Sequence, residues 1–110
     1  MATIVITIRL DGAGPGIILN DGVSNGSDIT THVKNGDTVK WKLIANSGIT
    51  SLDGIDDTST DVFNPDPSIQ PDGSYQGTVS STPGQVETYN VKYTFNGVQY
   101  PHDPSIQVHQ

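Results

Sequence analysis

The segment from Val86 to Tyr100 restricts the fold more than any other part of the chain. Between residues 86 and 95, four large apolar side chains occupy every second position: Tyr89, Val91, Tyr93 and Phe95. In an extended chain these side chains share one face and the polar residues between them share the other. Asn96-Gly97 follows directly, and this pair between two such runs is typical of a type I′ turn, whose central residues need positive φ. The segment predicts a β-hairpin whose first strand lies at the centre of a β-sandwich.

Period-two patterns predict further strands along the chain. Residues 3–10 alternate with isoleucine and leucine on one face, and residues 38–44 place the lone Trp41 in the core. Shorter strands are expected at 17–19, 29–33, 49–55, 74–80 and 105–108, and residues 56–72 form a long connection from one sheet to the other. The twelve glycines and seven prolines favour turns over helices. We expect one all-β domain over residues 1–110, a Greek-key β-sandwich of about seven to nine strands, with an immunoglobulin-like sandwich as the alternative.

Charge and composition exclude several classes of function. The net charge is −7 and only five basic residues are scattered along the chain, which argues against nucleic acid or an anionic membrane as a partner. No apolar run approaches the ~20 residues of a membrane-spanning helix, and the first residues lack the features of a signal peptide. The compartment is therefore unknown, with the cytoplasm as the default. The chain has no cysteine, so disulfides, thiol nucleophiles and thiolate metal sites are excluded.

Catalytic motifs are absent from the sequence. It contains no Gly-x-Ser-x-Gly, no His-Glu-x-x-His and no glycine-rich phosphate loop followed by lysine. Glu87 is the only glutamate, so a catalytic carboxylate pair needs two aspartates, and no such pair stands out. We therefore expect a protein that is not an enzyme.

Three segments of the chain share a further feature: residues 33–41 (Val-Lys-Asn-Gly-Asp-Thr-Val-Lys-Trp), residues 89–95 and residues 106–108. They resemble segments of the cupredoxin-like family. The first looks like the start of one of its strands, the second like the strand before its copper loop and the third like its closing strand. The resemblance implies a cupredoxin-like sandwich. A type-1 copper site needs two imidazoles and a thiolate. The expected histidine position falls within Asn46-Ser47-Gly48-Ile49 and the cysteine position at Phe95, so the resemblance implies a scaffold without type-1 copper.

A cluster of aspartates at the start of the long connection suggests a calcium site. Calcium takes six to eight oxygen ligands, often from loop carboxylates. The candidate ligands are Asp53, Asp56, Asp57 and Asp61. The competing interpretation is that these are solvated acids that prevent edge-to-edge pairing of sheets. Otherwise no cofactor is expected.

The three histidines, His32, His102 and His109, show no spacing that predicts a shared metal site. His102 and Asp103 lie just beyond the predicted hairpin, close to Tyr100. Tyr100, His102 and Asp103 are the candidate ligand-binding group. His102 with Asp103 is also a candidate site for sequestering zinc or copper(II).

Taken together, the residues favour a copper-free, cupredoxin-like binding or assembly module with an unidentified ligand. The exposed edges and end loops of a sandwich can bind a protein partner or pair into a homo-oligomer. The first alternative is a calcium-assisted, lectin-like module that binds carbohydrate through the aspartate cluster and Tyr100. The second is a zinc or copper(II) sequestering domain.

Overall fold

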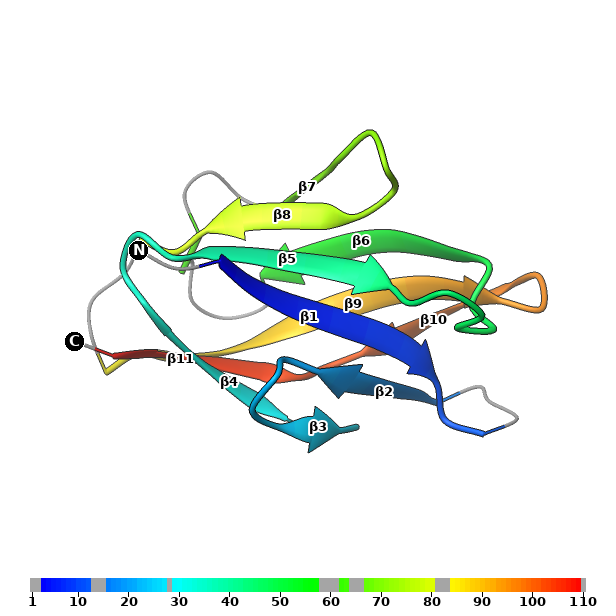
Figure 1. Cartoon of the computed structure of the whole chain (residues 1–110), viewed down its shortest axis with the longest axis horizontal. Coiled ribbons are helices and arrows are strands. Elements are labelled where there is room, and N and C mark those ends of the chain that lie inside the picture. Colours follow the sequence, from blue (N-terminus) through cyan, green and yellow to red (C-terminus); the bar gives the residue numbers. More distant parts are fainter. Residues whose placement is uncertain are drawn as a thin grey trace.

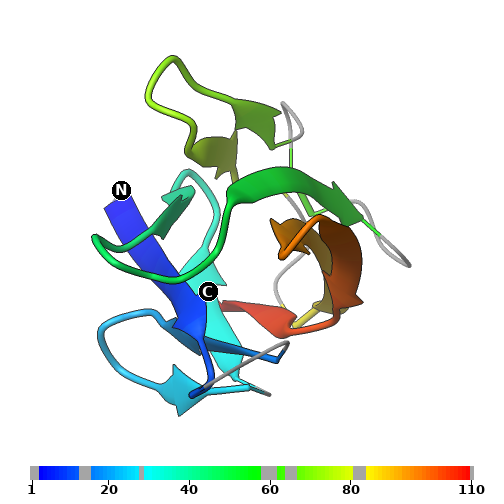
Figure 2. The same ribbon diagram turned by 90° about the vertical axis from the view of Figure 1, so that its right-hand side faces the viewer.

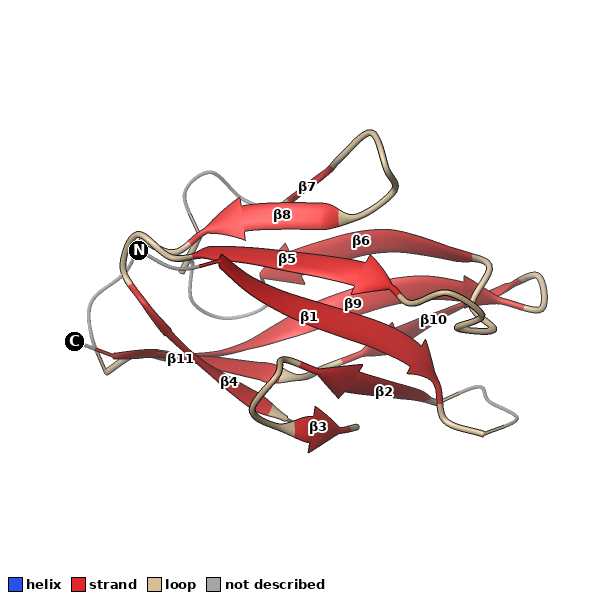
Figure 3. Ribbon diagram, viewed as in Figure 1, coloured by secondary structure: helices blue, strands red, loops and turns tan. Residues whose placement is uncertain are grey.

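The computed structural model describes residues 3–12, 16–27, 29–57, 62–63, 67–80 and 84–109. Within these residues it is all-β, without helices, and has two open sheets packed as a sandwich (Figure 1, Figure 3). None of these residues belongs to a helix that could cross a bilayer. The strands are β1 (Thr3–Leu10), β2 (Ile17–Asn20), β3 (Asn25–Gly26), β4 (Thr30–Lys34), β5 (Thr38–Leu43), β6 (Ser51–Asp57), β7 (Ser68–Ile69), β8 (Tyr75–Thr78), β9 (Val86–Phe95), β10 (Val98–His102) and β11 (Ser105–His109).

The first sheet has six strands in the order β3-β2-β1-β5-β8-β7. Its central pair, β1 and β5, is parallel, with Ile6 opposite Trp41, and the other pairs are antiparallel. The alternation expected for β1 is confirmed, because Ile6, Ile8 and Leu10 are buried. On the outer face of this sheet, β5 carries Lys40 and Lys42.

The second sheet contains β4, β6, β9, β10 and β11. Strand β9 pairs with β6 along one edge and with β10 and then β11 along the other. A hydrogen bond from Tyr89 N to Pro104 O (3.0 Å) continues the ladder between β10 and β11. The predicted turn is present, since Asn96 and Gly97 have φ of 54° and 78°. Strand β9 is thus an inner strand of its sheet, as expected.

The two sheets face each other (Figure 2), and aromatic side chains pack between them. Trp41 of β5 and Tyr89 of β9 are fully buried, with ring centroids 5.5 Å apart in an edge-to-face arrangement. The indole Nε1–H of Trp41 donates to the hydroxyl oxygen of Tyr89 at 3.1 Å. Burying about 200 Å² of an aromatic side chain contributes about 5 kcal/mol, against about 1 kcal/mol for a neutral hydrogen bond. Burial therefore stabilises the contact and the hydrogen bond fixes its geometry.

Strand β6 departs from the expected alternation. Simple alternation over residues 49–55 places Leu52 and Ile55 on opposite faces, yet both are buried. The register between β6 and β9 shifts between Leu52 and Gly54, so Asp53 is the extra residue of a β-bulge. The bulge turns Ile55 back into the core.

Two short strands were not expected from the sequence. Strands β3 and β7 have two residues each and lie within segments predicted to be loops. Their pairing extends the first sheet at both ends, so the described residues form eleven strands where about seven to nine were expected. The long connection also runs from the second sheet, at β6, to the first sheet, at β7.

The buried hydrogen bond between the sheets leads to a stability prediction. Tyr89→Phe leaves the Trp41 N–H without its acceptor, and we expect a loss of about 1–3 kcal/mol in the free energy of unfolding. Urea unfolding at constant m-value measures this loss. Tyr100→Phe is the matched control, because its hydroxyl has no hydrogen bond to the described residues. Equal losses in the two variants would contradict the assignment.

Candidate functional site

Asp53, the bulged residue of β6, joins three strands on the outer face of the second sheet. Its Oδ1 accepts a hydrogen bond from Ser51 Oγ at 2.6 Å. Its Oδ2 accepts from Thr94 Oγ1 of β9 and from Gln99 Nε2 of β10, the latter at 3.2 Å. The carboxylate is therefore surrounded by donors from its own protein.

The hydrogen bonds around Asp53 favour its ionised form. Burial raises its pKa, but the hydrogen bonds from Ser51, Thr94 and Gln99 outweigh burial, and the pKa lies below its usual value of 3.8. Asp53 thus stabilises the folded state as an anion whose oxygens are already occupied.

The other three aspartates of the predicted calcium cluster do not complete a site with Asp53. Asp56 forms an ion pair with Lys92, with Oδ2 2.5 Å from Nζ. The side chain of Asp57 and the whole of Asp61 lie outside the described residues. Within the part that is described, no group of three or more histidine, aspartate or glutamate side chains could hold a metal ion. Calcium binding stays a prediction.

The candidate group of Tyr100, His102 and Asp103 separates into different environments. The Tyr100 ring stacks on Tyr93, with centroids 5.8 Å apart. His102 Nε2–H donates to the carbonyl oxygen of Ser27, which follows β3 of the other sheet. Asp103 is exposed. The first two side chains thus have structural contacts, and a ligand-binding role for the three residues stays a prediction.

The loop after β5 lies beside the end of β9. Thr50 N donates to Thr94 O at 2.9 Å, which brings the two segments together. Phe95 is partly buried and packs against the core. Asn46 stands in the loop after β5 with a φ of 59°. The cupredoxin resemblance itself stays a prediction.

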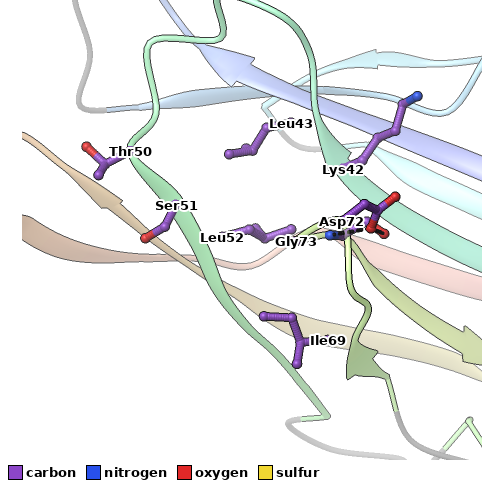
Figure 4. A pocket seen from close by; sticks show the side chains of 9 residues that line it. Lys42, Leu43, Thr50, Ser51, Leu52, Ile69, Asp72 and Gly73 are labelled. Atoms are coloured by element: carbon purple, nitrogen blue, oxygen red, sulfur yellow. Dashed lines mark hydrogen bonds between the residues drawn. The ribbon is translucent and has the colours of Figure 1, made fainter.

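A groove of about 500 Å³ opens between the two sheets and was not foreseen from the sequence. It lies between the end of β5, the start of β6 and the turn from β7 to β8 (Figure 4). Leu43 and Leu52 point into the space between their strands, whereas the amine of Lys42 points away from it. Ile69 adds an apolar side chain that is 62% exposed. The groove therefore combines an apolar floor with accessible walls.

Two strand edges that pair with no other described strand border this groove. Strand β8 pairs with β5 only from Thr38 to Trp41, so Lys42 and Leu43 extend beyond it. Among the residues that the structure describes, strand β6 pairs only with β9. Tyr75 Oη donates to Asp53 O at 2.8 Å and occupies one edge carbonyl of β6. Backbone hydrogen-bonding groups of both sheets are thus available along the groove.

The rim of the groove carries an ionised aspartate that is paired with a lysine. The Asp72 carboxylate accepts hydrogen bonds from Ser74 Oγ at 2.5 Å and from Ser74 N at 3.0 Å, and it forms an ion pair with Lys40 at 3.3 Å. These contacts lower the pKa of Asp72 to about 2, and the hydrogen bonds from Ser74 have the largest effect. Asp72 is therefore ionised at neutral pH.

The structure also pairs two histidines that the sequence spacing did not connect. His32 Nδ1 lies 2.6 Å from His109 Nε2, on the parallel strands β4 and β11. On each strand, exposed residues alternate with buried ones. This alternation brings the two histidines together only when the pairing of β4 with β11 is known.

Comparison with protein-family models and with curated proteins finds no match for this chain.

The hydrogen bonds around Asp53 predict a dependence of stability on pH. Because the pKa is lowered by folding, the stabilisation is present above 3.8 and disappears as pH falls through the pKa of the folded state. Urea unfolding should show Asp53→Asn less stable than wild type at neutral pH, with the difference shrinking in acid. Asp103→Asn is the control and should track wild type. A constant difference for Asp53→Asn would contradict the prediction.

Proposed function

We propose that this protein is a non-catalytic binding module whose groove between β5, β6 and the turn from β7 to β8 binds an extended peptide segment of a partner protein. The observation that carries the proposal is the meeting of two strand edges along one accessible groove. A peptide in extended conformation can hydrogen-bond to an exposed strand edge while its alternate side chains enter a groove.

The apolar side chains of the groove supply binding free energy. Leu43, Leu52 and Ile69 offer a surface on which one apolar side chain of the peptide can be buried. Fully burying a side chain the size of leucine contributes about 1.5–3 kcal/mol. Hydrogen bonds between the two backbones then fix the orientation of the peptide, and the apolar contact supplies most of its affinity for the groove.

The charge of the whole molecule selects among peptides. At the rim Asp72 is paired with Lys40 and Lys42 also lines the groove, so the selection comes from the net charge of −7 of the whole chain. A segment with a lysine or arginine near the buried apolar side chain is therefore attracted more than an acidic one, and opposite charges speed the encounter.

For the scaffold, we propose a Greek-key, cupredoxin-like sandwich without type-1 copper. Support comes from the segments of the resemblance, which correspond to β4 and β5, β9 and β11, and from the contact between residue 50 and residue 94. The absence of cysteine and the presence of Phe95 leave the type-1 site without its thiolate. An immunoglobulin-like sandwich is the alternative arrangement.

The two other functions remain as rival proposals. A calcium-assisted, carbohydrate-binding module has to recruit Asp53 away from its three donors, so it gains less from the structure than the peptide proposal. A zinc or copper(II) sequestering domain at His102 has to break the contact with Ser27. Both predict binding that a chelator abolishes, whereas peptide binding in the groove needs no metal.

A random peptide library displayed on phage tests the proposal. Panning in the presence of chelator should enrich peptides with an apolar residue beside a basic one. Ile69→Ser should weaken their binding by about tenfold, because about 1.4 kcal/mol of apolar contact is lost. Synthetic versions of the enriched peptides, titrated by calorimetry, measure the change.

Val98→Ser is the matched control. Val98 is an exposed apolar residue on β10, with 51% of its surface accessible, and it lies outside the groove. This variant should bind the enriched peptides as wild type does. No enrichment, or equal weakening by the two substitutions, would refute the groove as the binding site.

A further inference from the structure

Two imidazoles meet on the outer face of the second sheet, away from the groove. His32 and His109 are exposed, and their ring centroids lie 4.8 Å apart with planes tilted by 47°. In the register of β4 and β11, Gln107 is opposite His32 and Lys34 is opposite His109. The two histidines are therefore diagonal neighbours on adjacent strands, and their rings lean toward each other.

One ring nitrogen of each histidine faces a nitrogen of the other ring. His32 Nδ1 and His109 Nε2 are 2.6 Å apart, so one nitrogen donates a proton to the lone pair of the other. A metal ion that replaces this shared proton is bound by both lone pairs at once. Parallel strands hold the two residues in fixed positions, so chelation requires only side-chain rotation.

The choice of metal follows from the chemistry of the ligands. Imidazole nitrogens suit copper(II) and zinc, and with metal–nitrogen bonds of about 2.0 Å two cis ligands of a square-planar ion lie about 2.8 Å apart. The observed 2.6 Å therefore lets both nitrogens reach one ion after a small side-chain rotation. Copper(II) prefers tetragonal geometry and also heads the affinity order of the divalent first-row metals.

We propose that His32 and His109 form a copper(II) site in which one ion binds both imidazoles of a single chain and water completes its coordination. Zinc binds the same pair more weakly. The site shares no residue with the peptide groove, so it stands or falls independently of that function. It is also distinct from the missing type-1 site near Phe95, and it uses nitrogen ligands only.

One neighbouring charge opposes the bound ion. Lys34 is exposed and is the register partner of His109, so its ammonium group repels a cation on that ring. Removing this charge by Lys34→Gln should tighten copper binding severalfold at low ionic strength. A merely structural contact between the histidines would not respond in this way.

Calorimetric titration of the intact protein with copper(II), followed by electron paramagnetic resonance, tests the proposal. We expect one ion per chain and a spectrum with two equivalent nitrogen ligands. His32→Ala and His109→Ala should each weaken binding by about tenfold or more, because a chelate becomes a single ligand. Zinc should bind wild type more weakly than copper(II).

His102→Ala is the control, since it also removes one of three histidines but lies outside the pair. It should bind copper(II) as wild type does. Three results would overturn the proposal: no binding by wild type, undiminished binding by the double variant His32→Ala/His109→Ala, or half an ion per chain with a doubled molecular mass. Circular dichroism of each variant confirms that the sheets are intact.

Discussion

The contact between Trp41 and Tyr89 is the interaction on which the rest of the structure depends. Trp41 lies in the middle of β5 and Tyr89 in β9, so the contact joins the inner strands of the two sheets. Phe63 packs against the same indole, with ring centroids 5.5 Å apart. Burial also raises the pKa of Tyr89, which keeps its hydroxyl neutral beside the indole N–H. The position of one sheet over the other, and hence the groove between them, follows from this cluster.

The edges of the sheets explain where a partner can bind. Strands β3 and β7 end the first sheet with only two residues each, and Pro101 interrupts the donors of β10. Strand β6 is bulged, and Tyr75 occupies one of its carbonyls. Short, interrupted or bulged edges discourage indiscriminate pairing along the whole sheet. What remains is a limited stretch beside an apolar groove, which suits recognition of one short segment.

Much of the fold could be predicted because it follows from local patterns. The alternation of residues 86–95, the Asn96-Gly97 turn and the isoleucines of β1 each reflect the two-residue period of a strand. The bulge at Asp53 could not be predicted, because it depends on which residues of β9 pair with β6. The two-residue strands were missed for the same reason, since they carry no periodic signal of their own.

The candidate sites were harder to predict than the strands. Asp53 belonged to a plausible calcium cluster in the sequence, yet the fold gives its oxygens donors from Ser51, Thr94 and Gln99. His32 and His109 are far apart in the sequence and become neighbours only through the parallel pairing of β4 with β11. The groove likewise combines three segments that share no motif. Sites built by tertiary pairing leave little trace in a single sequence.

Hydrogen exchange of backbone amides with a bound peptide shows whether the groove accepts an extended chain. We expect the peptide to slow exchange for at least one amide of Lys42 and Leu43 and for edge amides of β6. The amides of β10 should exchange at their unbound rates. Protection confined to β10, or none along the groove while the peptide is bound, would rule out the groove as the binding site.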